Sequence, residues 1–339
     1  MKRVASLVVA VLVLGTLLYA QNPLTVTGAG ASFPYPIYSK WFDEFHAKNA
    51  NVQFNYQSVG SGAGIKQVTE GTVDFGASDM PMTDELIKAF QDKRGTGILH
   101  FPAVLGAAVP TYNIPGVTAT LNFTPEALVG IYLGKITKWN DAAIASANKG
   151  VTLPANDIVV VHRSDGSGTT FIWTDYLSKV SSEWKNKGGS INWPVGLGGK
   201  GSEGVTGLIK STPNSIGYVE LIYAVQNNVP FGAVKNAAGT FVKADLASVS
   251  AAAAAAAKDM PADFRVSITN AAGAKAYPIS SFTWLLIPQK WQDAGKREAV
   301  KKFLYWMLAD GQKDTEALSY AKLPKEVADK EKKAVDSIQ

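Results

Sequence analysis

The chain contains no cysteine and only three histidines, His46, His100 and His162. The absence of cysteine excludes disulfide bonds, thiol nucleophiles and cysteine-ligated zinc, and three separate histidines do not make a histidine-rich metal site. They also leave few candidate bases for a Ser-His-Asp hydrolase. Lysine and arginine form neither a run nor a basic helix stripe, so the formal charge of +5 does not indicate a nucleic-acid partner. We expect no bound metal and no nucleic acid.

Hydrophobic residues make up 46% of the 339 residues, and eight tryptophans are among them. This composition is typical of a folded protein with a substantial core rather than of a disordered chain. The length fits two domains of ordinary size, one larger domain, or two halves that exchange strands.

The N-terminus has the features of an export signal. Lys2 and Arg3 precede a largely apolar, uncharged stretch over residues 4–18, which is short for a membrane span. We predict a signal peptide over residues 1–20 that is cleaved after Ala20; an uncleaved anchor is the alternative. Because no cysteine is present for lipid attachment, the mature protein is expected to be soluble, without a lipid anchor, in the periplasm or the extracellular medium.

Strand-like and helix-like segments alternate along the chain. Residues 25–27 have strand character, and apolar residues then recur at helical spacing from Ile37 to Phe45. Further segments continue the alternation: strands at 52–56, 73–77, 103–110, 158–161, 215–219 and 282–287, and helices at 65–70, 124–133, 205–210 and 299–308, with another that starts after Ser164. The alternation predicts an α/β fold with a mostly parallel sheet. The alanine run 251–257 predicts a surface helix without functional weight.

Four loops place small residues or hydroxyls where a predicted strand leads into a predicted helix. They begin near Gly28, Gly60, Ala77 and Ser164. The N-terminus of a helix exposes unpaired N–H groups and the positive end of the helix dipole, so such loops favour an anion. For any one loop taken alone, simple helix capping by Ser, Thr or Asp is the preferred explanation.

The segment 162–170 (HRSDGSGTT) is the most informative of these loops. Glycine lets the backbone approach an oxyanion closely, and Ser167 and Thr169 offer hydroxyl donors. Arg163 can supply charge-assisted hydrogen bonds, and Asp165 is predicted to pair with it and orient its guanidinium.

Nucleotide-binding and hydrolase motifs are incomplete. Residues 166–168 (GSG) lack the spacing of a G-x-S-x-G elbow, and residues 28–33 (GAGASF) end in Phe where a dinucleotide fingerprint has Gly. Lys200 is followed by Gly201, whereas a Walker loop has Ser or Thr there. We therefore expect no nucleotide and no other cofactor.

Several motifs in order resemble one family. They are residues 27–34 (TGAGASFP), 73–79 (VDFGASD), 131–136 (IYLGKI), 164–169 (SDGSGT), 193–201 (WPVGLGGKG) and 215–220 (SIGYVE). The chain resembles, over essentially its whole mature length, the periplasmic phosphate-binding proteins of Pst-type ABC importers. The resemblance implies two α/β lobes, strands that cross between them as a hinge, and an anion in the interlobe cleft. We place lobe one at residues 23–104 and 276–339, and lobe two at residues 105–275.

The resemblance also implies the function and the ligands. It predicts a periplasmic, non-catalytic, high-affinity receptor for inorganic phosphate that acts as a monomer and delivers phosphate to the membrane permease of an ABC importer. The implied phosphate ligands are Ser32, Phe33 through its backbone N–H, Ser61, Asp79, Arg163, Ser167, Gly168 through its N–H, and Thr169, with Asp165 behind Arg163. Family members often have Thr where this chain has Ser32, and the hydroxyl is kept.

Asp79 is expected to determine selectivity. A carboxylate beside an oxyanion is repulsive unless the ligand carries a proton, as phosphate does at neutral pH and sulfate does not. The mismatch with sulfate would cost several kcal/mol, and about 4 kcal/mol corresponds to roughly a thousandfold in affinity. Two alternatives stay open: a receptor for another tetrahedral anion such as sulfate, and a secreted phosphohydrolase with Ser167 as nucleophile.

Overall fold

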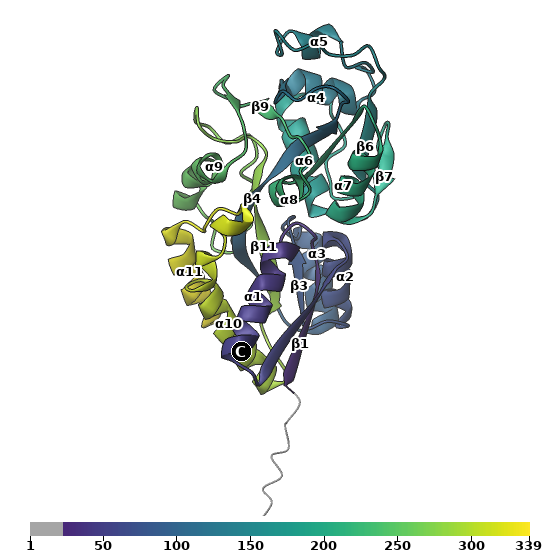
Figure 1. Cartoon of the computed structure of the whole chain (residues 1–339). Helices are drawn as coiled ribbons and strands as arrows, with labels where there is room; N and C mark the ends of the chain where they lie inside the picture. Colours follow the sequence, from purple (N-terminus) through teal and green to yellow (C-terminus); the bar gives the residue numbers. More distant parts are fainter. Residues whose placement is uncertain (1–22) are drawn as a thin grey trace, which may run out of the picture.

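The computed structural model describes residues 23–339, so the predicted signal peptide at 1–20 lies outside the described residues. An eight-stranded sheet runs the length of the molecule in the order β2-β1-β3-β11-β4-β8-β6-β7. A small second sheet has the order β10-β9-β5. Figure 1 shows two lobes, one above the other, with β4 and β11 between them.

The lower lobe in Figure 1 contains three consecutive strand–helix units, with β1 in the middle of a parallel group between β2 and β3. Apolar residues at helical spacing in α1, among them Trp41 and Phe45, are buried against this sheet, as their periodicity predicted. The elements are β1 Leu24–Gly30, α1 Tyr35–Lys48, β2 Val52–Ser58, α2 Ser61–Glu70, β3 Phe75–Ser78 and α3 Asp84–Arg94.

The upper lobe is built around β6, which pairs in parallel with both β7 and β8. Its elements are β5 Asn122–Phe123, α4 Pro125–Tyr132, α5 Ala142–Ala145, β6 Val159–Arg163, α6 Gly168–Val180, β7 Leu197–Gly199, α7 Gly201–Ser211, β8 Ser215–Glu220, α8 Leu221–Gln226, β9 Ala233–Lys235 and β10 Phe241–Val242. The predicted helices after Ser164 and at 205–210 are present, with α6 and α7 beginning at glycines.

One long strand joins the two lobes. β4 (Ile98–Asn113) pairs antiparallel with β11 (Ser280–Pro288) up to Ala107 and then, from Ala108, antiparallel with β8. The main sheet is parallel toward both edges, as predicted, but antiparallel at its centre, where β11 and β4 run antiparallel to their neighbours. Strands buried on both faces have similar apolar sequences in either direction, so the residue pattern did not reveal the reversal.

The alanine-rich helix is exposed on one face, as predicted, but its other face packs into the core. α9 (Leu246–Lys258) packs against β4, β11 and α11, and Ala252 and Ala253 are fully buried. Small side chains let this helix lie close to the two central strands. The remaining elements complete the lower lobe: α10 Ala294–Met307, two 3₁₀ turns at Gly311–Lys313 and Glu316–Leu318, and α11 Lys325–Val335. Within residues 23–339, no helix is both long enough and apolar enough to cross a bilayer.

A close backbone approach fixes α2, the helix that begins at Ser61. A Cβ added to Gly64 would lie 2.4 Å from Gly30 Cα and 2.6 Å from Ala29 O, so only glycine fits between α2 and β1. Gly207 in α7 offers the opposite case, because a Cβ there would meet nothing within 4 Å.

We expect Gly64→Ala to lower the free energy of unfolding by about 1–3 kcal/mol, since the added methyl group collides with backbone. Gly207→Ala is the matched control and should raise it by up to about 1 kcal/mol through helix propensity. Urea unfolding of the two variants measures the difference. A Gly64→Ala protein as stable as the parent would contradict the packing described here.

Candidate anion-binding site

The predicted site residues come together where the two lobes meet. Ser32 follows β1, Ser61 begins α2, Asp79 follows β3, and Arg163 ends β6. Ser167 is the N-cap of α6, and its Oγ accepts a hydrogen bond from Thr170 N–H at 3.0 Å. All of these side chains are at most 4% exposed.

Ser61 links the two lobes. Its Oγ accepts hydrogen bonds from Gly168 N–H at 3.0 Å and from Asp79 N–H at 3.3 Å. A Cβ on Gly168 would lie 2.6 Å from both Ser61 Oγ and Asp79 Cβ, so glycine is required for this approach. The neighbouring Gly62 N–H donates to Gly166 O at 2.9 Å, again across the two lobes. The N-termini of α2 and α6 therefore face each other across the junction.

Asp79 is a carboxyl group buried among hydroxyls. Thr283 Oγ1 donates to its Oδ1 at 2.8 Å, and Thr169 Oγ1 lies 3.5 Å from its Oδ2. Burial raises the pKa of Asp79 to about 7, although the hydroxyl of Thr283 and the charge of Arg163 act in the opposite direction. The carboxyl group can therefore change its protonation state near neutral pH.

Arg163 forms the pair with Asp165 that the sequence suggested. Its Nε and one terminal nitrogen donate to the two carboxylate oxygens at 2.7 and 2.5 Å, which is a bidentate arrangement. Burial alone would raise the pKa of Asp165, but the hydrogen bonds and charge of Arg163 outweigh it and hold the pKa below its usual value. Gly201 N–H donates to the same carboxylate at 3.0 Å, so α7 helps to hold the guanidinium plane.

Ser32 and Phe33 lie in the turn between β1 and α1. Ser32 Oγ is 2.9 Å from Ser202 Oγ and accepts a hydrogen bond from Ser202 N–H at 3.1 Å. Phe33 is fully buried, and its side chain has no polar atom, so its backbone N–H is the only donor that it can offer to an anion.

Several residues that contact this set were not predicted from the sequence, and three of them contact Ser32 Oγ, the Asp79 carboxyl and Arg163 N–H. Ser202 contacts Ser32, Thr283 contacts Asp79, and Tyr218 OH accepts a hydrogen bond from Arg163 N–H at 3.2 Å. The glycine-rich motif at residues 193–201, just before Ser202, could have indicated the contact between Ser202 and Ser32. Thr283 and Tyr218 lie inside apolar strands, where a single polar side chain gives no indication of the partner that it faces.

The arrangement is suited to hold a small anion rather than a metal. Backbone N–H groups, hydroxyls and one guanidinium gather at helix N-termini, which stabilise negative charge. Within residues 23–339, no group of three or more acidic or histidine side chains is arranged to hold a metal ion.

Comparisons with known proteins agree with this fold. A family model described as a PBP superfamily domain matches residues 19–311. The chain is 47% identical to the phosphate-binding protein PstS of Xylella fastidiosa, over 88% of this chain and 81% of that protein. It is 46% identical to PstS of Pasteurella multocida, over 90% of this chain and 88% of that protein.

Among solved structures, the chain is similar to a high-affinity periplasmic phosphate-binding protein (PfluDING) bound with phosphate at pH 8.5. The TM-score is 0.71 with 23% identity, and the match covers 90% of this chain and 92% of the other. This likeness confirms the two-lobed α/β fold, and the sequence relatives confirm the family that the motifs suggested. The chain is a member of the PBP superfamily and belongs, within it, to the family of PstS phosphate-binding proteins.

Proposed function

We propose that this protein is a high-affinity receptor for inorganic phosphate and that it binds the phosphate between its two lobes. The observation that carries the proposal is the buried carboxyl of Asp79 and the buried guanidinium of Arg163, which approach the same junction from opposite lobes. The relatives are named phosphate-binding proteins, and the similar solved structure holds phosphate.

The proposed ligands are the eight residues inferred from the sequence, and their chemistry fits phosphate. Arg163 supplies the positive charge, and helix N-termini supply N–H donors. The ligands are Ser32, Phe33 N–H, Ser61, Asp79, Arg163, Ser167, Gly168 N–H and Thr169, with Asp165 orienting Arg163. Ser61 Oγ and Gly168 N–H, which contact each other in this structure, would turn toward the anion.

Asp79 gives the proposal its selectivity. An ionised Asp79 accepts a hydrogen bond from the proton of hydrogen phosphate, whereas sulfate presents only acceptors to it. Among residues 23–339, no structural feature favours sulfate as the preferred ligand.

We also propose that the protein binds without catalysis. Ser167 would be the nucleophile of a phosphohydrolase, but its Oγ is used as the cap of α6. The nearby His162 stacks its ring on Trp193 at a centroid distance of 4.9 Å, and its Nδ1 lies 3.0 Å from Arg163 O. This ring is held by contacts other than Ser167, so the phosphohydrolase alternative has no support here.

The remaining proposals concern organisation and partners. We place lobe one at residues 23–104 and 276–339 and lobe two at residues 105–275, close to the point where β4 changes partner between Ala107 and Ala108. The protein is proposed to be a monomer, exported to the periplasm with cleavage of residues 1–20 and without a lipid anchor. It would deliver phosphate to the membrane permease of an ABC importer.

Asp79→Asn should keep phosphate affinity within about tenfold and raise sulfate affinity, because an amide can donate to sulfate where a carboxylate cannot. Calorimetric titration of both anions into protein that has been unfolded, stripped of bound anion and refolded tests this. Sulfate binding that is equally weak in the variant and the parent would refute the role assigned to Asp79. A parent protein that binds neither anion would refute the proposed function itself.

The raised pKa of Asp79 also predicts a pH dependence of stability in the anion-free protein. Between pH 3.8 and about 7, the Asp79 carboxyl binds more protons in the folded state than in the unfolded state. The free energy of unfolding therefore falls as the pH rises through this range. The full shift corresponds to at most about 4 kcal/mol. Asp79→Asn removes the titration, so its stability relative to the parent should be higher at pH 8 than at pH 5.

Asp175→Asn is the matched control, because Asp175 does not act on the pKa of Asp79. Burial alone would raise the pKa of Asp175, but hydrogen bonds from Lys187, Ser267 and Thr269 lower it to about 2. Its contribution to stability is therefore fully present at both pH values, and this variant should lose the same free energy of unfolding at each. Urea unfolding at pH 5 and pH 8 gives both differences. If the effect of Asp79→Asn were the same at the two pH values, Asp79 would not titrate in the folded protein between them.

A further inference from the structure

The groups of the proposed site are buried between the two lobes in this structure. Asp79, Ser167 and Thr169 are each 1% exposed and Arg163 is 4% exposed. An anion can reach these groups only if the lobes separate. Hydrogen bonds that cross between the lobes must therefore break on opening and form again on closing.

The turn at residues 31–33 is held by three tyrosine hydroxyls, one on each successive carbonyl. Tyr56 donates to Ala31 O at 2.7 Å, Tyr223 to Ser32 O at 2.6 Å and Tyr320 to Phe33 O at 2.6 Å. Tyr56 and Tyr320 belong to the lower lobe, which also carries the turn. Tyr223 comes from α8 in the upper lobe.

Tyr223 acts on the peptide group that contains a proposed phosphate donor. Ser32 C=O and Phe33 N–H are in the same trans peptide, so they point in opposite directions. A hydroxyl that holds the carbonyl on one side directs the N–H to the other. Tyr35 N–H donates to the same carbonyl at 3.2 Å from within the lower lobe, and Tyr223 adds the contact from the opposite lobe.

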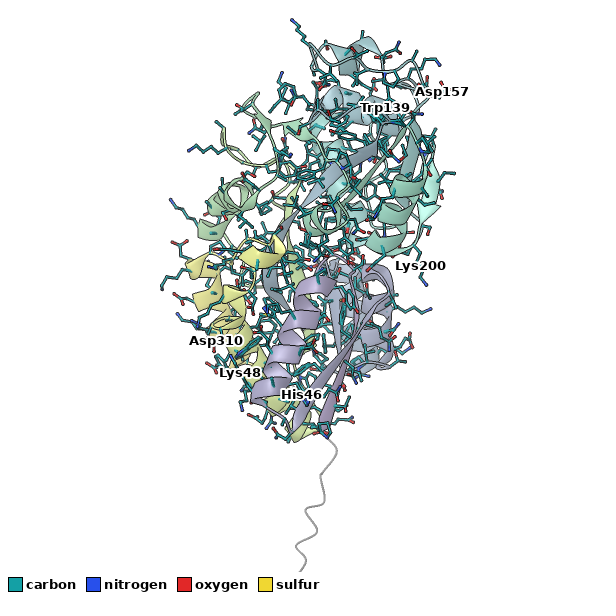
Figure 2. The ribbon with its side chains drawn as sticks, in the orientation of Figure 1. His46, Lys48, Trp139, Asp157, Lys200 and Asp310 are labelled. Atoms are coloured by element: carbon teal, nitrogen blue, oxygen red, sulfur yellow. The ribbon has the colours of Figure 1, made fainter. Side chains whose placement is uncertain are left out.

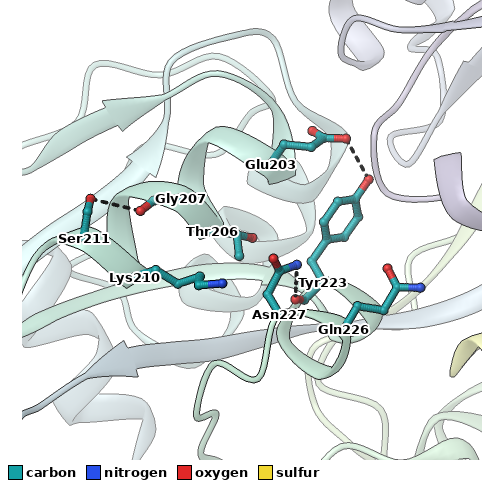
Figure 3. Close-up of a pocket in the computed structure, with 8 residues that line it drawn as sticks. All are labelled: Glu203, Thr206, Gly207, Lys210, Ser211, Tyr223, Gln226 and Asn227. Atoms are coloured by element: carbon teal, nitrogen blue, oxygen red, sulfur yellow. Dashed lines mark hydrogen bonds between the residues drawn. The ribbon is translucent and has the colours of Figure 1, made fainter.

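The Tyr223 hydroxyl has a second acceptor in its own lobe. Glu203 Oε1 of α7 lies 3.0 Å from the hydroxyl, as the dashed line in Figure 3 shows. Both side chains line a surface hollow of about 500 Å³ beside the site. Because one proton has two acceptors, Tyr223 can release Ser32 O on opening and still donate to Glu203. The contact with Ser32 can therefore be broken without leaving an unpaired buried donor.

Ser202 of α7 makes the second contact between the upper lobe and the turn. Lys200, the N-cap of α7 two residues before Ser202, lies where the lobes meet (Figure 2). Ser202 N–H and Oγ both lie within hydrogen-bond distance of Ser32 Oγ, at 3.1 and 2.9 Å. When both groups donate, the lone pairs of Ser32 Oγ are occupied and its own proton is directed elsewhere.

We propose that Tyr223, assisted by Ser202, is a positioning residue that couples closure of the lobes to the orientation of the Phe33 N–H and Ser32 hydroxyl. This inference rests on the proposed phosphate-binding function. The two contacts form only when the lobes are together. They therefore hold the bound anion in place and do not affect its first encounter with the open protein.

Tyr223→Phe removes the hydroxyl and keeps the ring. We expect phosphate to dissociate about three to ten times faster, the effect of losing one hydrogen bond, while the association rate stays within about twofold. Stopped-flow measurements with inorganic phosphate and anion-stripped protein give both rates. Ser202→Ala should also raise the dissociation rate and leave the association rate nearly unchanged. It provides the same test if Tyr223→Phe does not fold. Tyr305→Phe, which removes an exposed hydroxyl bonded to Asp336, is the matched control and should change neither rate.

A second measurement needs no ligand. The chain has no cysteine, so Lys48→Cys and Asp157→Cys, at opposite ends of the molecule in Figure 2, place spin labels on the two lobes. In the phosphate-free protein, Tyr223→Phe should shift the distance distribution toward the longer, open separation. If the parent binds no phosphate but this shift appears, the proposed function fails and the positioning role stands.

The inference is overturned if the parent binds phosphate and Tyr223→Phe changes neither the dissociation rate nor the distance distribution. It is also overturned if the association rate falls as much as the dissociation rate rises, because Tyr223 would then act on the open protein.

Discussion

The burial of a carboxyl group at Asp79 is the constraint on which the proposed site depends. Arg163 is the nearby cation, but its guanidinium is already bound in bidentate fashion by Asp165. With Asp79 ionised, these three side chains carry a net negative charge, and an arriving anion adds to it. Peptide dipoles at the starts of α2 and α6, together with the hydroxyls of Thr169 and Thr283, must supply the compensation. Such a site favours an anion that brings its own proton.

The fold places these groups by joining two strand–helix systems through one strand. β4 is paired with β11 in the lower lobe and with β8 in the upper lobe, so its backbone is continuous across the junction. The loops after β1, β2 and β3 then face the loop after β6. Close approach depends on residues without side chains: Gly168 beside Asp79, and Gly62 beside Gly166. The tyrosine hydroxyls on the 31–33 turn add directional control at the same junction.

Sequence patterns predicted most elements because those elements are amphipathic or flanked by glycine. The apolar spacing of α1 reports directly which face is buried, and the glycine-rich loops mark the helix starts of the site. The patterns did not predict the antiparallel centre of the sheet or the burial of one face of α9, where Ala252 and Ala253 are covered by neighbouring elements. Alanine has high helix propensity in any environment, so its sequence carries little information about what packs on it.

The sequence by itself determined the family, the α/β alternation and the residue types that can hold an anion, because these depend on local motifs and on short-range spacing. Only the tertiary structure decided which groups meet. Ser61 and Gly168 are 107 residues apart, Asp79 and Thr283 are 204 apart, and Ser32 and Tyr223 are 191 apart. The same structure decided the pKa of Asp79, which depends on removal of the carboxyl from water by both lobes together. Contacts and desolvation of this kind arise from packing of distant segments, and no local pattern of residues encodes them.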